Sequence, residues 1–466
     1  MVIERDFSPD GPEIELGEVS AMSRRLLYLL IEEADRELKS RALIASVAVE
    51  RGFDVVLLPQ WTAWRNWAAL PPGVALFKGN NAAQCVEMRE AKRHGHLVAS
   101  IEEEPLGVIG EREIHRCYAP AIDEVCDILF ANGESQAEVL RARFGALSGS
   151  IHVVGNPRVD LLKGAFIGDV HAAAEDLRRR YGDFILINTN FSSINPRDGD
   201  TLAYFDTCAN VGVLDPRQAD DLDDFFTWCA WERTNLGAVG EFVQKARERS
   251  PWPLIIRPHP TENLEPWEEI AAGMGEGARV IREGDHLAWT AAARILVHPG
   301  CTTGTEALLL GTPAVSLAVD DNPWHELYLS NLVNPRADSV DRALDMVADH
   351  AEGGEAISRG RDVCFENLTR HIATGPEHYS CVEITNILDA TQVPRVSTRR
   401  VSELATVAPV PATEGKIDGA RFAPDPVEAL IESYRDTLGF CERARVREPS
   451  PGVLHCAPIS HAAAAL

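Results

Sequence analysis

The sequence has no long apolar run of the kind that crosses a membrane. A membrane span needs ~18 to 20 continuous apolar residues. The longest apolar region, from Ala307 to Val319, is interrupted by glycine, threonine, proline and serine. The opening residues, MVIERDFSPDGPEIELGE, are acidic and lack the apolar segment of a secretory signal. These absences argue against an integral membrane or secreted protein and predict a cytoplasmic one.

Positive charge is also scarce. The chain of 466 residues has 45 lysines and arginines against 71 aspartates and glutamates, which gives a formal net charge of −26 at pH 7. Nucleic acids and anionic bilayers bind clustered cations, so the composition argues against nucleic acid as a partner. An anionic ligand would have to be held by a few local groups.

The chain lacks the usual cysteine and phosphate motifs. Its ten cysteines are scattered, with no Cys-x-x-Cys pair and no His/Cys cluster at the spacing of a zinc site. We therefore expect reduced thiols and no metal site. No Walker loop is present, and no Gly-x-Gly-x-x-Gly follows the first predicted strand. Any nucleotide site must be built in another way.

What the chain does have is an alternation of short apolar runs with amphipathic stretches, which is typical of βα units on a parallel sheet. The first group of runs predicts a Rossmann-like domain over 23–165, preceded by a flexible segment over 1–22. These runs are Leu26–Ile31, Val55–Pro59, Val74–Phe77, Leu97–Ile101, Ile128–Ala131 and Ile151–Val154.

A second group of runs predicts another Rossmann-like domain over 175–391, after a polar link around Gly164 to Ala174. Residues 392–466 are rich in Pro, Ala, Ser and Thr, and we expect a largely disordered tail there, with one helix at Pro426 to Tyr434. The predicted fold class is α/β, with two Rossmann-like domains facing a cleft and a C-terminal tail. The second group of strands is Phe184–Asn188, Leu254–Arg257, Arg279–Ile281, Arg294–Val297 and Ala314–Leu317.

Two turns in the second domain carry groups suited to phosphate. The first is Arg257-Pro258-His259-Pro260, directly after a predicted strand, where Arg257 and His259 offer donors and the prolines stiffen the turn. An ordinary proline-stiffened loop is an equally good interpretation of this turn by itself.

The second turn follows the strand ending at Val297 and leads into a predicted helix. The free N–H groups and dipole of a helix start attract anions, and glycines allow a ligand close to the backbone. An ordinary Thr-capped helix is the alternative, but two such turns in one domain favour a nucleotide. The candidate ligands in this turn are His298, Gly300, Thr302, Thr303, Gly304 and Glu306.

Together, RPHP and HPGCTTGTEALLLGTPAVSL resemble glycosyltransferases of the GT-B fold, in particular the bacterial surface carbohydrate (polysaccharide) biosynthesis proteins. They are also similar to GT-B sialyl- and Kdo-transferases, which use CMP-sugars. The resemblance implies that His259, Pro260, Thr302 and Thr303 hold the nucleotide phosphate and that Glu306 binds the ribose. It further implies a nucleotide-sugar substrate, no separate cofactor and no bound metal. IHVVGNPRVD (151–160) looks like the interdomain segment of GT-B transferases and UDP-GlcNAc 2-epimerases.

Candidate catalytic groups in the first domain are carboxylates. Glu32 follows the first predicted strand, and Glu102 and Glu103 follow the fourth, so we expect all three at the cleft. One of them could act as general base on an acceptor hydroxyl. Acidic residues that simply begin helices are the alternative. His259 is a further catalytic candidate, because it can stabilise the leaving phosphate.

A polar loop after the strand Phe184–Asn188 contains Asn190 and Ser192, which are candidate ligands for phosphate or sugar hydroxyls. Asn/Ser-rich sequences also simply form good turns.

The preferred function is a glycosyltransferase that moves a sugar, Kdo or a related ulosonate from a CMP donor, onto a cell-surface glycan or a lipid-linked acceptor. A lipid-linked acceptor would bring the protein to the inner face of the plasma membrane. The alternatives are a UDP-HexNAc 2-epimerase, a CDP-polyol phosphotransferase and a non-catalytic nucleotide-sugar-binding scaffold of polysaccharide assembly.

Overall fold

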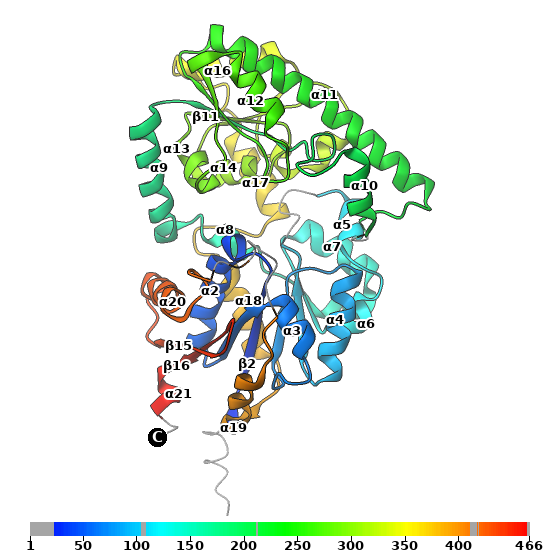
Figure 1. Ribbon diagram of the computed structural model, residues 1–466, viewed down its shortest axis with the longest axis vertical. Helices are drawn as coiled ribbons and strands as arrows, with labels where there is room; N and C mark the ends of the chain where they lie inside the picture. Colours follow the sequence, from blue (N-terminus) through cyan, green and yellow to red (C-terminus); the bar gives the residue numbers. More distant parts are fainter. Residues whose placement is uncertain (1–22, 104–108, 211–212, 411–416, 418, 464–466) are drawn as a thin grey trace, which may run out of the picture.

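The computed structural model describes residues 23–103, 109–210, 213–410, 417 and 419–463. The predicted flexible segment 1–22 lies outside them. The chain forms two lobes, each built on a sheet whose central strands run parallel (Figure 1). Two α/β domains with Rossmann-like sheets confirm the predicted fold class.

The first domain holds an eight-stranded sheet in the order β15-β16-β3-β2-β4-β5-β6-β7. Strands β2 to β7 run parallel. Every residue of β2 is buried, because helices cover both faces of the sheet. These strands are β2 (Leu26–Ile31), β3 (Asp54–Pro59), β4 (Val74–Phe77), β5 (Leu97–Ile101), β6 (Ile128–Ala131) and β7 (Ile151–Val153). The helices between them are α2 (Ala34–Glu50), α3 (Gln60–Asn66), α4 (Ala82–Arg93), α5 (Glu111–Cys117), α6 (Ile122–Val125) and α7 (Glu134–Arg143).

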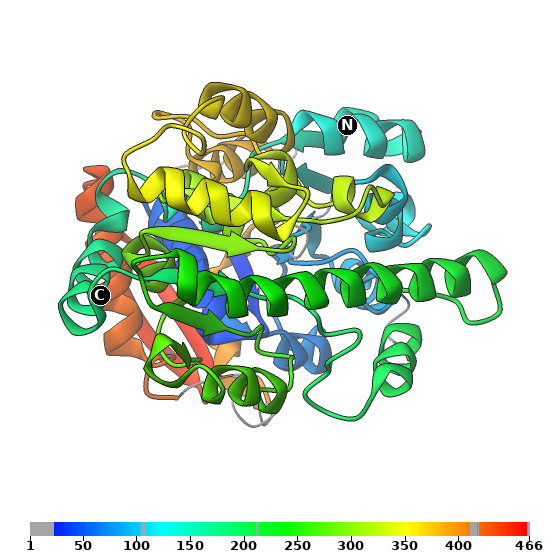
Figure 2. The same ribbon diagram turned by 90° about the horizontal axis from the view of Figure 1, so that it is seen from above.

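The second domain holds a six-stranded parallel sheet in the order β10-β9-β8-β11-β12-β13, the Rossmann order 3-2-1-4-5-6. Figure 2 shows its longest helix, α11, running across this domain. The strands are β8 (Ile185–Asn188), β9 (Leu254–Arg257), β10 (Ala278–Val280), β11 (Ile295–His298), β12 (Ala314–Leu317) and β13 (Arg336–Ala337). The helices are α9 (Gly168–Tyr181), α10 (Thr201–Asn210), α11 (Ala219–Arg249), α12 (Glu265–Ala272), α13 (His286–Ala292), α14 (Thr303–Leu310), α15 (Leu329–Leu332), α16 (Val340–Ala351) and α17 (Arg361–His371).

The joint between the domains is more helical than predicted. The expected link at 164–174 contains a short 3-10 helix and the first half of α9, which packs on α13. Helix α18 (Ser380–Ala390) falls within the predicted second domain but packs on α2 and on α8 (Pro157–Asp160) of the first. Both carboxylate oxygens of Asp160 accept hydrogen bonds from the first N–H groups of α18, which fixes the returning chain. The 3-10 helices are η1 (Gly145–Ser150), η2 (Gly164–Ile167), η3 (Gly275–Gly277), η4 (Pro323–Leu327) and η5 (Ser402–Thr406).

The tail over 392–466 differs from the prediction of a largely disordered segment. Its strand β16 pairs antiparallel with β3, and its helix α20 packs on α2 (Figure 1). The apolar runs there are short, yet residues from α20, β15 and β16 join the core of the first domain. The tail elements are β14 (Val396–Ser397), which pairs with β1 (Ser23–Arg24), then α19 (Thr398–Val401), α20 (Pro424–Leu438), β15 (Ala444–Ser450), β16 (Val453–Pro458) and α21 (Ile459–Ala463).

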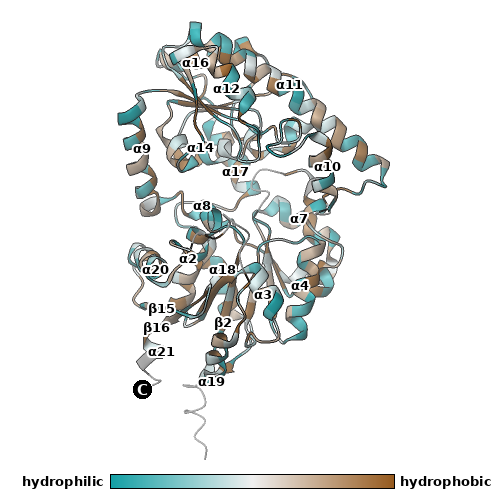
Figure 3. Ribbon diagram, viewed as in Figure 1, coloured by the Kyte–Doolittle hydropathy of each residue, from teal (hydrophilic) through white to brown (hydrophobic). Residues whose placement is uncertain are grey.

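Each sheet has a point where the strand order reverses, and ligands of such sheets bind there, outside the carboxyl ends of the strands. In the second domain this point lies between β8 and β11, and in the first between β2 and β4. Apolar residues concentrate in the strands, and polar ones on the outer helices (Figure 3). Among the described helices, none combines the length and the apolar character needed to cross a membrane.

Candidate functional site

The loop after β11 begins with a buried histidine that supports the loop from below. His298 is fully buried, and its Nδ1 accepts a hydrogen bond from the backbone N of Gly300 (3.2 Å). A Cβ at Gly304 would overlap the imidazole, so glycine is required where α14 crosses the ring. Burial lowers the pKa of His298 to about 3. The neutral side chain therefore packs under the helix start and does not face a ligand, which corrects the prediction for His298.

The start of α14 presents hydroxyls that bond to no other described residue. Thr302 is the N-cap residue, and its side chain makes no capping hydrogen bond. The Oγ1 atoms of Thr303 and Thr305 are buried and have no hydrogen-bond partner within the described part of the chain. Gly300 has φ +122°, a conformation that favours glycine, and turns the chain into this helix. The helix start thus keeps two buried hydroxyl donors without a partner among the described residues, and anion binding at this turn stays a prediction.

Glu306 lies one turn into α14 and is ionised by its neighbours. It is 7% exposed, and its Oε2 lies 3.1 Å from Nε2 of His286. Burial alone would raise the pKa of Glu306, but His286 and the charge of Arg158 lower it. Burial likewise opposes the charge on His286, yet Glu306 raises the pKa of this imidazole. Each partner therefore favours the charged form of the other.

Arg257 does not point toward the predicted phosphate site. Its guanidinium donates hydrogen bonds to the carbonyls of Ile281 (3.3 Å), Arg282 (3.2 Å), Glu283 (2.8 Å) and Gly284 (3.0 Å). Burial lowers its pKa to about 10. The side chain therefore holds the turn between β10 and α13, and the prediction of a phosphate ligand is corrected here.

His259 and Ser192 do come together, because β8 and β9 are neighbouring strands. The Nδ1 of His259 lies 2.6 Å from Oγ1 of Thr261, and Ser192 is hydrogen-bonded to the same hydroxyl. Pro260 is exposed beside them, and Asn190 is half-buried on the loop that carries Ser192. The two polar loops predicted from sequence therefore form one surface next to the reversal point of the sheet.

Two buried carboxylates behind this surface were not found from the sequence. Glu262 is fully buried and accepts from Thr189 Oγ1 (2.6 Å), His259 N (3.0 Å) and Trp267 Nε1 (3.1 Å). Glu232 on α11 accepts from the hydroxyl of Ser193. Burial raises the pKa of Glu232 to about 8, and the charge of Glu262 adds to the rise. The position of Glu262 three residues after His259 was a usable signal, whereas Glu232 sits inconspicuously in a long helix.

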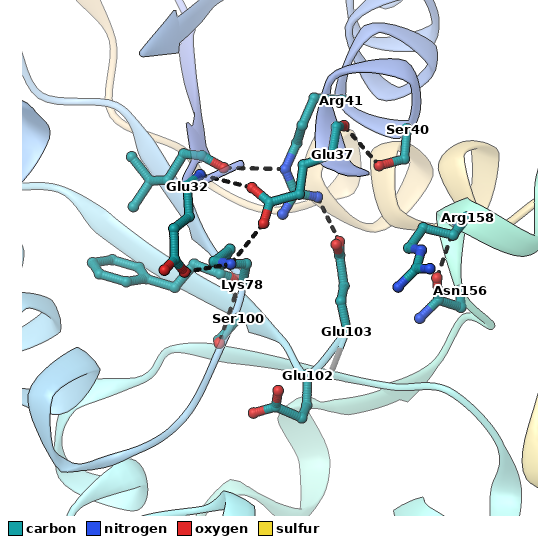
Figure 4. A network of polar contacts seen from close by, with 12 residues as sticks. Glu32, Glu37, Ser40, Arg41, Lys78, Ser100, Glu102, Glu103, Asn156 and Arg158 are labelled. Carbon is teal, nitrogen blue, oxygen red and sulfur yellow. Dashed lines mark hydrogen bonds and ion pairs between the residues drawn. The ribbon is translucent and has the colours of Figure 1, made fainter. Parts of the chain in front are cut away.

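The carboxylates of the first domain form a buried ion network at its own reversal point (Figure 4). Glu103 pairs with the fully buried Arg41 at 2.5 Å, so its charge is already neutralised. Lys78 lies between Glu32 (2.7 Å) and Glu37 (2.6 Å), and these two charges raise its pKa although burial opposes the rise. The side chain of Glu32 is the more accessible partner, at 29% exposure against 5% for Glu37.

Glu102 directly follows β5 and precedes Glu103 in the chain. It is 5% exposed, and its Oε2 accepts a hydrogen bond from the backbone N of Asn80 (3.1 Å). All three predicted catalytic carboxylates thus have partners in the structure: Glu103 pairs with Arg41, Glu32 with Lys78, and Glu102 accepts from the backbone of Asn80. Their catalytic role stays a prediction.

A small pocket lies where the two domains meet. It is lined by Arg158, Val159 and Leu162 near α8 and by Thr302, Thr305, Glu306 and Leu309 on α14. The Nη2 of Arg158 lies 3.7 Å from Oε1 of Glu306. Arg158 belongs to the interdomain segment that resembled GT-B proteins, but sequence reasoning did not single it out. The described residues contain no group of three or more His, Cys, Asp or Glu side chains suited to a metal ion.

No family model matches the sequence, and no curated protein matches it. Solved structures are similar in fold. The UDP-GlcNAc 2-epimerase of Methanocaldococcus jannaschii, in complex with UDP-GlcNAc and UDP, is 14% identical with a TM-score of 0.48, covering 79% of this chain and 100% of that one. A putative UDP-N-acetylglucosamine 2-epimerase from Listeria monocytogenes is 12% identical with a TM-score of 0.48, and the match covers 78% of this chain and 94% of that one. The wall teichoic acid polymerase TagF is 10% identical with a TM-score of 0.41, and the match covers 68% of this chain and 72% of that one. Function has to be inferred from the chain's own residues.

Proposed function

We propose that this protein is an enzyme that acts on a nucleotide sugar, with the nucleotide phosphate bound at the start of α14. The observation that carries the proposal is the pair of buried hydroxyls, on Thr303 and Thr305, that have no partner among the described residues. They lie on a helix whose start borders the reversal point of a Rossmann sheet. Helix N–H groups, the helix dipole and hydroxyl donors together favour a phosphate.

The neighbouring groups suit the rest of a nucleotide. The ionised carboxylate of Glu306 can accept hydrogen bonds from a ribose diol. His259 and Ser192 lie on the adjoining loops and can donate to a phosphate or to a sugar hydroxyl. In the reaction, such donors would stabilise charge on the departing phosphate without a bound metal or another cofactor.

Within this class we propose a glycosyltransferase, with Kdo or a related ulosonate from a CMP donor as the sugar and a cell-surface glycan or lipid-linked compound as acceptor. The motif resemblance supports this choice of donor. Glu32 is our candidate for the general base, because its carboxylate is the more accessible one beside Lys78. A lipid-linked acceptor would bring the protein to the inner face of the plasma membrane.

A thermal-shift and calorimetric screen against CMP, CDP, UMP, UDP, GDP and ADP tests the nucleotide site. A ligand that binds the native state raises the melting temperature by mass action. The nucleotide that raises it most therefore identifies the base of the donor. Thr302→Ala/Thr303→Ala should abolish this shift, whereas Thr207→Ala, an exposed threonine on α10, should leave it unchanged. No response of the wild-type protein to any nucleotide would overturn the proposal.

The type of reaction is tested with the nucleotide sugar that matches the selected base. Turnover that requires an added glycan or lipid-linked acceptor supports the transferase, and Glu32→Gln should then lower kcat while Glu124→Gln, an exposed control, does not. Interconversion of the nucleotide sugar without an acceptor would instead identify a 2-epimerase. Tight nucleotide binding with no turnover of any kind would favour the scaffold.

A further inference from the structure

Arg158 brings a positive charge from the first domain to the proposed phosphate site on the second. It lies on α8, at the joint between the domains, and lines the pocket together with Thr302, Thr305 and Glu306. Its side chain is 20% exposed. A ligand at the start of α14 would therefore meet this guanidinium from the opposite side.

The backbone that carries Arg158 is held rigidly. Asn156, which is fully buried, accepts a hydrogen bond from the Arg158 backbone N (3.0 Å). Gly155 has φ +84°, and a Cβ there would overlap the Ala373 carbonyl. Asp160 is fixed at the start of α18. The backbone of α8 is thus set in place, and the Arg158 side chain is the part that can adjust to a ligand.

The side chain itself is loosely paired. Its ion pair with Glu306 measures 3.7 Å, beyond hydrogen-bonding distance, whereas the buried pair of Arg41 and Glu103 measures 2.5 Å. Among the residues that the structure describes, the guanidinium of Arg158 makes no hydrogen bond. Glu306 meanwhile has a closer partner in His286 at 3.1 Å. Arg158 can therefore leave Glu306 without stranding that carboxylate.

The pocket also contains a buried hydroxyl that needs a partner. Thr305 is 1% exposed, lines the pocket, and its Oγ1 has no hydrogen-bond partner among the described residues. A helix start, a hydroxyl donor and a planar guanidinium together match a phosphate, whose oxygens accept several bonds at once.

We propose that Arg158 binds a phosphate group of the nucleotide ligand, exchanging its ion pair with Glu306 for the phosphate. This inference rests on the proposed function. Because Arg158 comes from the facing domain, the same contact ties the two domains together around the bound ligand. On this proposal Arg158 contacts the phosphate and neither the base nor the ribose.

The test compares a nucleotide with its own nucleoside. Calorimetry is carried out with the nucleotide that stabilises the wild-type protein most, with the matching nucleoside, and with inorganic pyrophosphate. Arg158→Ala should weaken nucleotide affinity about tenfold or more and leave nucleoside affinity unchanged, since a charge-assisted bond to phosphate is lost. The nucleotide affinity of Arg158→Lys should lie between those of the wild type and Arg158→Ala, because lysine supplies a positive charge without the planar guanidinium.

Arg89→Ala is the matched control, because Arg89 is also in the first domain and has a loose pair with Glu124 at 3.4 Å, far from α14 in the fold. It should bind both ligands like the wild type. Equal loss of nucleotide and nucleoside affinity in Arg158→Ala, or loss of neither, would overturn the role of Arg158 and leave the nucleotide site standing. Failure of the wild-type protein to bind any nucleotide or pyrophosphate would overturn both proposals. If Arg158→Ala does not fold, the nucleotide and nucleoside affinities of Arg158→Lys provide the same test.

Discussion

Glu232 is the residue at which burial and charge conflict most clearly. It is 1% exposed on α11, it faces Ser193, and its pKa of about 8 lies above the ordinary value of 4.5. When folding raises the pKa of a carboxyl group, the native state favours the neutral form. The contribution of this group to stability is complete below its pKa in the unfolded protein, and it is lost as the pH rises through its pKa in the folded protein.

We predict that Glu232→Gln removes this pH dependence. The melting temperature of the wild-type protein should fall relative to that of the variant between pH 5 and pH 8, by an amount corresponding to a few kcal/mol. Thermal unfolding at a series of pH values measures the difference. Parallel pH profiles for the two proteins would show that Glu232 is not protonated in the native state.

Single residues also show the limit of what the sequence predicts. The rule that polar residues after parallel strands face a cleft located His259, Ser192 and the start of α14 correctly in the fold. It could not predict that Arg257 turns back to four carbonyls of a neighbouring loop, because side-chain direction depends on a turn some 25 residues further along the chain. The burial of His298 depends in the same way on α14 crossing above it.

At the scale of elements, the close crossing of α14 over β11 depends on Gly304. A Cβ there would overlap the His298 ring, which is buried and has no room to move. We predict that Gly304→Ala lowers the free energy of unfolding by about 1–3 kcal/mol, the usual cost of overpacking.

The control for Gly304→Ala is another helical glycine. Gly237 is exposed on α11, and a Cβ there would meet nothing within 4 Å. Gly237→Ala should therefore stabilise the protein by about 0.5–1 kcal/mol through helix propensity. Urea unfolding of both variants measures the two effects, and destabilisation of equal size in both would contradict the role of the crossing.

The C-terminal elements are predicted to be essential for the fold. A chain ending at Thr391 would expose the face of α2 that α20 covers and the edge of β3 that β16 pairs with. We expect this chain to lose cooperative unfolding. Leu454→Ala, at a fully buried position of β16, should cost about 2–5 kcal/mol, whereas Val86→Ala, at a position 58% exposed, should cost little. A truncated chain with the wild-type melting temperature would refute this prediction.

The helix predicted at Pro426 to Tyr434 corresponds to α20, but strands β15 and β16 were missed for a physical reason. The strands β2 to β6 are short continuous apolar runs, because both of their faces are covered, and such runs are visible in the sequence itself. Strand β15 buries only Ala444, Val446 and Ser450 within ARVREPS, and β16 pairs with β3, some 400 residues earlier in the chain. The pairing of two strands so far apart in the chain leaves no signal in the local amino-acid composition.

At the scale of the whole molecule, a cluster of ion pairs joins the domains away from the proposed site. Arg116 on α5 of the first domain contacts Asp221 (2.8 Å) and Asp224 (2.6 Å) on α11 of the second, and Arg112 contacts Asp224 (2.6 Å). These side chains are partly exposed, so each pair contributes only about 0.2–1 kcal/mol and is weakened by salt. A contribution of this size is enough to bias two domain arrangements that differ little in free energy.

We predict that Asp221→Asn/Asp224→Asn shifts the protein toward a more open arrangement. Small-angle X-ray scattering should give a larger radius of gyration for this variant at low salt, and high salt should expand the wild-type protein to the same value. The control is Asp341→Asn/Asp345→Asn, which removes two charges that pair with Arg249 at the other end of α11, within the second domain. That variant should keep the wild-type dimensions and their salt dependence. Identical scattering of all three proteins at both salt concentrations would mean that other contacts, such as the backbone hydrogen bond between Ile109 and Leu327, hold the domains together without this cluster.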